Sequence, residues 1–365
     1  MSFDLIVIGG GPAGCAASIT AARSSPRVLQ LERGRFPRHK VCGEFISAES
    51  LELLGQLVGQ KQTRLVTEAP RISRARVFVD DAELAAEVSP AAASVTRFDL
   101  DHALWSSAIE SGVDAREDST VRSVSGAGPF VVKTASETFA AKAVINATGR
   151  WSNLTSSAVR ACVSDERWIG IKAHFREPIS SQSVDLYFFD GGYCGVQPVT
   201  ASQNGSGTVV NACAMVRAEV ATTLQQVFAA HSALHERSHH WTPTMDPVTT
   251  SPLVFHEPEL VPSGMLQTGD SATFVDPFIG DGISLALRSG TLAAECLTRF
   301  FNGECSQQQA TLNYCMAYQH KLARVFRNSS RVRRLLSWQS IVRKPALLLL
   351  QRAPALTTML VRMTR

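Results

Sequence analysis

Two kinds of hydrophobic pattern divide the chain. Near its start, residues 5–8 form a continuous apolar run, which is typical of a strand covered on both faces. An alanine-rich stretch over 13–22 predicts a helix, and the segment 27–31 predicts a second strand. Another buried strand is expected in the run AKAVINATG at 141–149, which ends in a glycine turn. The alternation of strands and helices predicts an α/β fold with a parallel sheet.

The segment from 165 to 255 has a different pattern. Strand-like runs occur at 168–176, 184–190, 193–199 and 207–216, and glycine-rich turns separate them. A helix is expected at about 218–235. This pattern predicts an antiparallel sheet, which would form the wall of a substrate chamber.

The first strand leads into a glycine motif with the spacing G-x-G-x-x-G, formed by Gly9, Gly11 and Gly14. The first glycine permits a tight turn, the second lets a pyrophosphate approach the backbone, and the third lets the helix pack closely on the strand. Glu32 ends the second strand, where a carboxylate can bind ribose hydroxyls. This order predicts a dinucleotide site, and the unit alone leaves NAD and FAD open.

Two distant segments favour FAD. They read VTRFDLDHAL at 95–104 and GDSATFVDPFIGDGISLAL at 269–287. With them, residues 3 to about 300 resemble the FAD-dependent family of aromatic hydroxylases, flavin-dependent halogenases and geranylgeranyl reductases. The likeness is strongest to the geranylgeranyl reductase-like branch, in which GD-A-x-F-x-P-x-x-G-x-GI-x-x-A recurs.

The resemblance implies a Rossmann-like FAD-binding domain that is discontinuous in the sequence. We expect it to comprise residues 1–75, 95–165 and 256–305, with a β-sheet substrate domain at 76–94 and 166–255. A basic C-terminal helical region would occupy 306–365, with helices at 306–330, 331–338 and 345–363.

The resemblance also implies which residues contact the cofactor. Asp270 would contact the ribityl chain, and a helix beginning near Gly282 would point its positive end at the flavin ring. Arg97 starts another helix and would contact FAD, and basic residues in 34–47 could meet its pyrophosphate or an anionic substrate. The full set expected at the cofactor is Gly9, Gly11, Pro12, Ala13, Gly14, Glu32, Arg33, Lys40, Cys42, Arg97, Ala147, Gly149, Gly269, Asp270, Pro277, Gly280, Gly282 and Ile283.

Candidate substrate contacts are Tyr193, Pro198 and Phe278, and Cys42 is the candidate catalytic residue near flavin and substrate. The segment GGYCGVQPV at 191–199 stands where geranylgeranyl reductases show Y-x-W-x-F-P, so Gly195 and Gln197 replace the Trp and Phe. The lining of the chamber therefore differs from that branch. No W-x-W occurs in the chain, which argues against the halogenase signature W-x-W-x-I-P.

Charge is spread unevenly along the chain. The formal net charge is +4, and the segment after Glu304 holds eleven Lys or Arg and no acidic residue, so residues 1–304 sum to 4 − 11 = −7. This basic region could cap the chamber, bind an anionic membrane, bind an acidic carrier protein or simply pack on the FAD domain. Nucleic acid is an unlikely partner for a body with an acidic balance. Eight cysteines without a C-x-x-C pair fit a reducing compartment, and we expect a cytoplasmic protein.

Three histidines, His231, His235 and His239, are spaced by four residues and would form a stripe if they lay on one helix. They are interpreted as a solvated helix face, and no metal site is predicted. The functional hypothesis is an FAD-dependent monooxygenase acting on an apolar aromatic, polyketide or isoprenoid molecule, with NADPH or NADH as electron donor. The alternatives are a geranylgeranyl reductase-like C=C reductase and a non-catalytic FAD-binding module.

Overall fold

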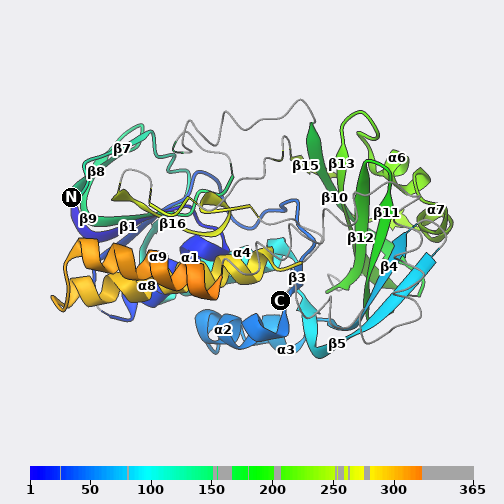
Figure 1. Ribbon diagram of the computed structural model, residues 1–365, viewed down its shortest axis with the longest axis horizontal. Helices are drawn as coiled ribbons and strands as arrows, with labels where there is room; N and C mark the ends of the chain where they lie inside the picture. Colours follow the sequence, from blue (N-terminus) through cyan, green and yellow to red (C-terminus); the bar gives the residue numbers. More distant parts are fainter. Residues whose placement is uncertain are drawn as a thin grey trace.

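The computed structural model describes residues 1–24, 26–79, 82–150, 154, 167–179, 181–200, 207–250, 253, 259–261, 264–274 and 280–322. Two sheets lie at opposite ends of the long axis, with helices gathered around the first of them (Figure 1). Over the described ranges, no helix is long and apolar enough to span a membrane. The α/β architecture with a Rossmann-like sheet is confirmed.

The first sheet has seven strands in the order β6-β2-β1-β9-β8-β7, with β16 paired to β9. β1 lies between β2 and β9 and is parallel to both, whereas β7, β8 and β9 are antiparallel neighbours. β1 buries Leu5, Ile6 and Val7 completely, as its apolar run predicts. The strand bounds are β1 (Ser2–Ile8), β2 (Val28–Leu31), β6 (Asp114–Arg116), β7 (Ser123–Ser125), β8 (Phe130–Lys133), β9 (Thr138–Asn146) and β16 (Leu266–Gln267).

Helices pack on this sheet and on one another. Helix α1 (Pro12–Ala22) is buried along almost its whole length and lies against α8 (Gly282–Phe301). A Cβ atom on Gly290 would lie 2.1 Å from the Ala13 carbonyl oxygen, so these two helices require glycine where they meet. The other helices of this region are α2 (Ala48–Val58), α3 (Arg64–Thr67), α4 (Arg97–Glu110) and α9 (Gln307–Lys321).

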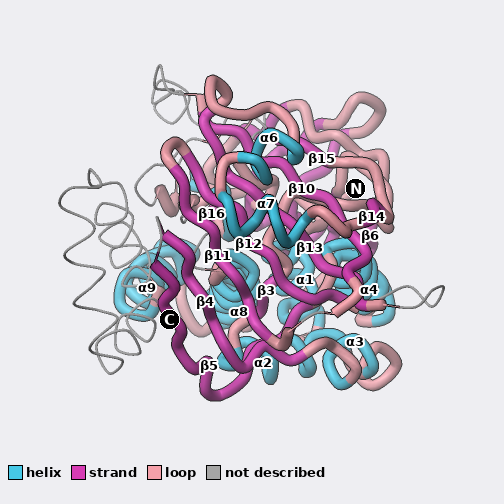
Figure 2. Tube along the Cα trace, turned by 90° about the vertical axis from the view of Figure 1, so that its right-hand side faces the viewer, coloured by secondary structure: helices cyan, strands magenta, loops and turns pink. Residues whose placement is uncertain are grey.

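The second sheet has nine strands in the order β14-β10-β13-β12-β11-β4-β5-β3, with β15 paired to β10. All its pairs are antiparallel except β11 with β4. The bounds are β3 (Phe45–Ile46), β4 (Arg71–Val79), β5 (Ala82–Ser94), β10 (Trp168–Glu177), β11 (Ser183–Phe189), β12 (Gly192–Val199), β13 (Thr208–Arg217), β14 (Thr242–Pro243) and β15 (Val248–Thr250). Two short helices, α6 (Leu224–Ala229) and α7 (Ser232–Ser238), cover its outer face (Figure 2).

The prediction of one helix at 218–235 is wrong. The segment forms α6 and α7, because Thr223 and Gln226 build a capping box that begins α6 and the chain turns at Ala230 and His231. His231 precedes α7 and is buried against Phe78 and Tyr187, so it does not belong to a solvated helix face. His235 and His239 lie in α7 and at its end.

The helix starts expected at Arg97 and Gly282 are confirmed. Thr96 caps α4, since its hydroxyl accepts a hydrogen bond of 3.1 Å from the Asp99 amide. The helix expected at 306–330 is present as α9, which ends at Lys321. The two helices expected at 331–338 and 345–363 lie outside the described residues, as does most of the basic segment that was considered for membrane or carrier binding.

Candidate active site

A cavity of about 600 Å³ lies between the two sheets. One side is formed by residues that follow the carboxyl ends of parallel strands: Gly9 after β1, Glu32 after β2 and Ala147 after β9. The other side is formed by β12 and β13 through Tyr193 and Met215. The crevice beyond the carboxyl ends of parallel strands is where α/β sheets bind their ligands, and the volume suits a bound organic molecule.

The glycine turn after β1 is built by close backbone contacts. Gly9 has φ +112°, and a Cβ there would lie 2.3 Å from the Ala147 carbonyl oxygen. A Cβ on Gly14 would lie 2.0 Å from the Gly9 carbonyl oxygen. At Gly11, by contrast, an added Cβ would meet only Lys40 Nζ at 3.9 Å and Arg97 Nη2 at 4.0 Å. The turn is therefore tight where it packs and open toward the cavity.

The start of α1 has the features of a phosphate site. Gly11 precedes the helix and gives no side-chain cap, and Pro12 occupies its first position. The first amides of the helix are thus available to a ligand, and the helix dipole favours an anion there. The open face of Gly11, with two cationic side chains beyond it, fits the pyrophosphate of a dinucleotide such as FAD.

Glu32 is buried at the end of β2 and already holds the turn. Its carboxylate accepts hydrogen bonds from the Gly10 amide at 2.7 Å, the Gly34 amide at 2.9 Å and Arg38 Nη2 at 2.8 Å. Burial acts to raise the pKa of Glu32. The positive charges of Lys40 and Arg38 and the hydrogen bond from the Gly10 amide outweigh burial and hold the pKa below its ordinary value. The residue therefore stays ionised, as an acceptor of ribose hydroxyl bonds requires.

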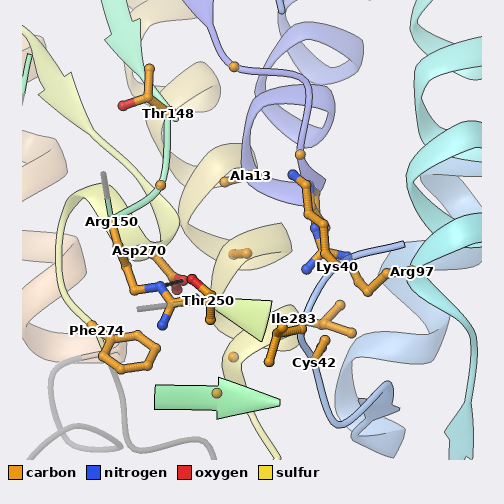
Figure 3. Close-up of a pocket in the computed structure, with 18 of the residues that line it drawn as sticks. Ala13, Lys40, Cys42, Arg97, Thr148, Arg150, Thr250, Asp270, Phe274 and Ile283 are labelled. Atoms are coloured by element: carbon orange, nitrogen blue, oxygen red, sulfur yellow. Dashed lines mark ion pairs between the residues drawn. The ribbon is translucent and has the colours of Figure 1, made fainter. Parts of the chain in front are cut away.

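Lys40 and Arg97 lie together on one side of the cavity and share the buried carboxylate of Asp101 (Figure 3). Arg97 makes two bonds of 2.7 Å to Asp101, and Lys40 Nζ lies 3.7 Å from the same group. Burial lowers the pKa of Lys40 below its ordinary value. Asp101 acts to raise this pKa, but the nearby positive charges of Arg97 and Arg38 add to the effect of burial and outweigh it. Lys40, Arg97 and Asp101 together therefore carry a net positive charge next to the amide groups at the start of α1.

The start of α8 forms the opposite end of the cavity. Gly280, Gly282 and Ile283 line it, together with Cys42 from the loop before β3 and Phe45 from β3 itself. Gly280 has φ +76°, and a Cβ there would lie 2.9 Å from Phe45, whereas a Cβ on Gly282 would meet nothing within 4 Å. A flat ring can therefore approach the first turn of α8 at Gly282.

Asp270 and Arg150 come from two turns that meet at the cavity. The turn Gly269–Ser271 follows β16, and Arg150 follows the Ala147–Gly149 turn after β9. Arg150 Nε lies 3.6 Å from an Asp270 oxygen, and its guanidinium lies 4.4 Å from the centre of the Phe274 ring. The Asp270 carboxylate is thus placed at the cavity beside a cation and an aromatic ring (Figure 3).

The wall supplied by the second sheet is mostly apolar. Tyr193, Met215, Leu253 and Phe274 form one buried cluster and all line the cavity. Gly170 also lines it, and a Cβ there would lie 2.8 Å from Val41 and 3.0 Å from Thr250. This wall can bind an apolar molecule and exclude water from it.

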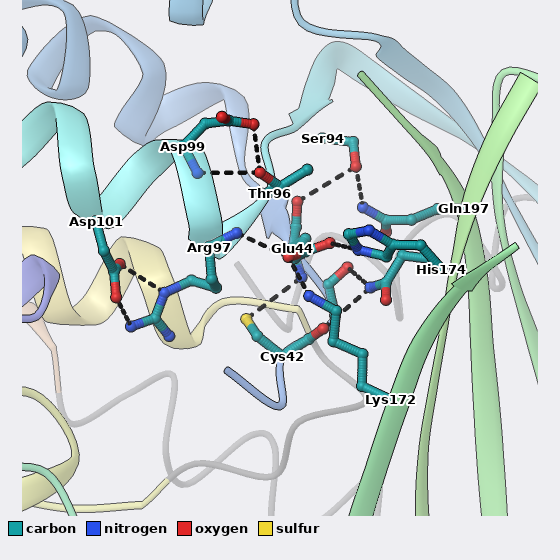
Figure 4. A network of polar contacts seen from close by, with 12 residues as sticks. Cys42, Glu44, Ser94, Thr96, Arg97, Asp99, Asp101, Lys172, His174 and Gln197 are labelled. Carbon is teal, nitrogen blue, oxygen red and sulfur yellow. Dashed lines mark hydrogen bonds and ion pairs between the residues drawn. The ribbon is translucent and has the colours of Figure 1, made fainter. Parts of the chain in front are cut away.

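A buried ionic network joins the two halves of the molecule at Glu44 (Figure 4). Its carboxylate pairs with Lys172 Nζ and lies 2.8 Å from His174 Nε2, both on β10. It also accepts a bond of 2.7 Å from the Arg97 amide at the start of α4. Burial acts to raise the pKa of Glu44, but His174 and Lys172 outweigh it and hold the pKa below 4.5.

The same network fixes the loop that carries Cys42. Asn211 Nδ2 donates to the carbonyl oxygens of Cys42 and Gly43, each at 3.0 Å, and the Glu44 amide donates to Cys42 Sγ at 3.3 Å. Glu44 adopts φ +63°, which is uncommon for a residue with a side chain. The position of Cys42 at the cavity therefore depends on contacts with β10 and β13.

His39 lines the cavity beside this network. Its ring lies 4.9 Å from Phe98 and 5.4 Å from His174, measured between ring centres. Burial lowers the pKa of His39 below 6.5, and the positive charges of Lys172 and His174 add to the effect despite Glu44 and Asp99. The ring is therefore neutral at neutral pH.

Most residues expected at the cofactor line this one cavity, although they lie far apart in the sequence. They are Gly9, Gly11, Pro12, Ala13, Glu32, Arg33, Lys40, Cys42, Arg97, Ala147, Gly149, Asp270, Gly280, Gly282 and Ile283, and the substrate candidate Tyr193 joins them.

Three expected residues are placed elsewhere. Gly14 packs α1 on the glycine turn, and Gly269 packs its own turn on Ala13. Pro198 does not line the cavity, because side chains alternate along β12 and Pro198 lies on the face opposite Tyr193. Pro277 and Phe278 lie outside the described residues.

The sequence interpretation missed the partners of Glu44. Lys172 and His174 stand two residues apart on a strand whose apolar character was the only feature used to predict it. A lysine and a histidine on the same face of a predicted buried strand were the available signal, since buried charges require partners. The stacking of Arg150 on Phe274 had no signal in the sequence, because it depends on two separate turns meeting.

Flavoproteins are found among the known proteins that are similar to this chain. The family described as FAD dependent oxidoreductase matches residues 36–174. Digeranylgeranylglycerophospholipid reductase 2 of Methanopyrus kandleri is 24% identical, over 93% of this chain and 88% of that protein. Menaquinone reductase of Mycolicibacterium smegmatis is 26% identical, over 81% of this chain and 76% of that protein.

Among solved structures, flavin-dependent brominase Bmp2 is similar with a TM-score of 0.78, at 17% identity, over 100% of this chain and 93% of that one. The chondrochloren halogenase CndH is similar with a TM-score of 0.71, at 21% identity, over 90% of this chain and 83% of that one. These likenesses show the fold. The matched segment and the relatives make the chain similar to FAD-dependent oxidoreductases, among them geranylgeranyl reductases, menaquinone reductases and flavin-dependent halogenases.

Proposed function

We propose that the chain is a flavin-dependent reductase that adds hydrogen to a C=C bond of an apolar, prenyl-type molecule. The observation that carries the proposal is the apolar wall of Tyr193, Met215, Leu253 and Phe274 facing the cavity that also holds the glycine turn. Two relatives that align over most of this chain are named as reductases of a digeranylgeranyl lipid and of menaquinone, which supports the same chemistry here.

Each part of the cavity has a proposed task. The amides at the start of α1, with Lys40 and Arg97, would bind the pyrophosphate of FAD, and Glu32 would bind a ribose. Asp270 would accept hydrogen bonds from the ribityl chain, and the start of α8 would lie against the flavin ring. FAD supplies the hydride chemistry when bound.

The substrate would lie against the apolar wall, which keeps water out of the cavity. Cys42 is the proposed catalytic residue at the junction of ring and substrate, where the Asn211 and Glu44 bonds hold its backbone and thiol. We further propose NADPH or NADH as the electron donor.

A single-turnover experiment tests the proposal. Holoprotein reduced with dithionite is mixed without oxygen with a polyprenyl alcohol or a menaquinone, and flavin reoxidation is followed by absorbance. A C=C reductase reoxidises its flavin and yields a product heavier by two hydrogens with one saturated prenyl double bond. With menaquinone, mass fragmentation must separate this product from the quinol, which is also heavier by two hydrogens. A reduced flavin that stays reduced with both substrates, and reacts only when oxygen is admitted, contradicts the proposal. Bleaching of the oxidised holoprotein by NADPH or NADH tests the donor separately.

A monooxygenase is the second candidate, and Gly195 and Gln197 favour it. The reductase-like branch has Trp and Phe at these positions. A Cβ on Gly195 would lie 3.3 Å from Leu186, and Gln197 donates a bond of 2.6 Å to Ser94 instead of presenting an aromatic ring. Oxygen uptake matched by a product heavier by one oxygen atom would select this candidate. A protein that retains FAD and performs neither reaction would fit the non-catalytic module.

A further inference from the structure

Arg150 differs from Arg38 and Arg97, two other guanidinium groups that line the cavity. Its side chain is 18% exposed, and its contacts in the described part of the chain are the Asp270 carboxylate, 3.6 Å from Nε, and the Phe274 ring at 4.4 Å. Both contacts leave the terminal Nη groups without a hydrogen-bond acceptor among the described residues. Figure 3 shows this guanidinium across the cavity from Lys40 and Arg97.

The backbone holds Arg150 firmly in this place. The Gly149 amide donates to Ser271 Oγ at 2.8 Å, and the same hydroxyl donates back to the Gly149 carbonyl at 3.2 Å. Gly149 itself has φ +82°, so the chain reverses sharply just before Arg150. The turn that carries Arg150 is therefore tied to the turn that carries Asp270, and the guanidinium lies over the Phe274 ring.

The charge of Arg150 is less well neutralised than that of its neighbours. Arg97 makes two bonds of 2.7 Å to Asp101, and Arg38 makes one of 2.8 Å to Glu32. A guanidinium that is mostly removed from water and holds only one loose partner gains from a further anion with good geometry. The planar pair of Nη donors matches two oxygens of a phosphate.

We propose that Arg150 binds a phosphate group inside the cavity, with Asp270 and Phe274 setting its orientation. The inference rests on the assignment as an FAD enzyme, and two sources share the chemistry. One is the pyrophosphate of FAD, held between Arg150 and the start of α1. The other is the phosphate of a second ligand, an electron donor or a phosphorylated substrate, that enters after FAD has bound.

The test uses the full-length Arg150→Gln and Arg150→Lys variants. Apoprotein is titrated with FAD and with riboflavin, which lacks phosphate, by flavin fluorescence. Holoprotein is titrated with inorganic pyrophosphate by calorimetry. The control variant is Arg64→Gln, which also removes an arginine, from a side chain that is 89% exposed in α3. Riboflavin affinity and thermal melting report whether each variant keeps its fold.

A cofactor phosphate predicts that Arg150→Gln weakens FAD binding about tenfold or more, that Arg150→Lys weakens it less, and that riboflavin binding is unchanged. A second ligand predicts unchanged FAD binding and loss of the pyrophosphate binding that wild-type holoprotein shows. The proposal is overturned if FAD and pyrophosphate affinities both match wild type, or if riboflavin binding falls as much as FAD binding. A wild-type protein that binds no FAD would instead refute the proposed function.

Discussion

The two walls of the cavity are built in different ways. The glycine-turn wall uses mainly backbone groups of the stretch from β1 through α1 to the end of β2, where Gly14 packs on Gly9, and Ala147 after β9 closes the turn. The wall around Cys42 uses side chains whose partners stand 128 and 130 residues away, Lys172 and His174 with Glu44. The first wall is a local motif, whereas the second exists only when the two sheets have come together.

The difference separates two kinds of vulnerability. A change in the local wall acts through steric overlap and should mainly affect the cofactor. A change in the long-range wall leaves a charge buried without its partner, which is among the most destabilising events in a protein.

The largest expected effect is that of Glu44→Gln. Lys172 is fully buried and would lose its carboxylate partner, so the free energy of unfolding should fall by about 3–5 kcal/mol. Chemical denaturation followed by circular dichroism measures it. The double variant with Lys172→Met should recover much of the loss, since no unpaired charge remains.

The exposed pair Lys61 and Glu110 provides the control for that cycle. Its side chains are 74% and 42% exposed at 3.1 Å, so Glu110→Gln should leave the denaturation midpoint nearly unchanged. Equal losses for Glu44→Gln and Glu110→Gln would show that the buried network does not join the two sheets as described.

The second effect is that of Gly14→Ala. The new Cβ would lie 2.0 Å from the Gly9 carbonyl oxygen, so the turn must shift and the free energy of unfolding should fall by about 1–3 kcal/mol. FAD content after purification should fall with it, because the shifted turn is the one proposed to face the pyrophosphate. Absorbance of the purified protein gives the flavin content.

Gly55→Ala is the matched substitution. Gly55 lies inside α2, and an added Cβ would meet nothing within 4 Å, so alanine should stabilise the helix by about 0.5–1 kcal/mol and leave FAD content intact. If both alanine variants behave alike, steric closeness at Gly14 is not what matters.

The same division explains how much the sequence could predict. The strand, glycine turn, helix and terminal glutamate were predictable, because each lies within 30 or so residues and obeys local rules. The strands of the second sheet were also predictable from turns and apolar runs. Arg97 and Asp270 needed the family resemblance, since neither has a local pattern that places it at a nucleotide.

Other features were beyond local patterns. The break at Ala230 and His231 divides the expected helix, because tertiary packing buries His231 against Tyr187. Pairing of Glu44 with β10 depends on a register that one sequence does not specify. Local chemistry can thus be deduced from spacing, and side-chain networks across sheets require the fold.

A third, smaller effect is the dependence of stability on pH. The pKa of His39 lies below 6.5 in the fold and that of Glu44 below 4.5. Both groups resist protonation in the folded protein. Their contribution to folding stability is therefore complete when the pH is above their ordinary pKa values, and it is lost as the pH falls through the lower pKa values of the folded state. The melting temperature should fall on acidification, first near pH 6.5 and then more steeply near 4.5.

The charged and titratable groups that face His39 are Lys172, His174, Glu44 and Asp99. His39→Gln should flatten the part of the profile near pH 6.5 and leave the carboxylate part in place. A wild-type melting temperature that rises between pH 7 and pH 5 would contradict the assigned directions, because the sign is the same for both groups.

The smallest effect on stability, and the sharpest on function, is expected for Cys42→Ala. Cys42 is only partly buried, and its thiol accepts one bond of 3.3 Å from the Glu44 amide, so the melting temperature should change little. FAD content should also stay at the wild-type level, since Arg97, the neighbour of Cys42 at the proposed pyrophosphate site, keeps its two bonds to Asp101. Flavin reoxidation by substrate in a single turnover should slow, because Cys42 faces both the start of α8 and the apolar wall.

Cys194→Ala, at a fully buried thiol, is the control and should lose stability while its single turnover stays normal. Wild-type reoxidation in Cys42→Ala would reduce Cys42 to a packing residue and would leave the network around Glu44 with a structural task alone.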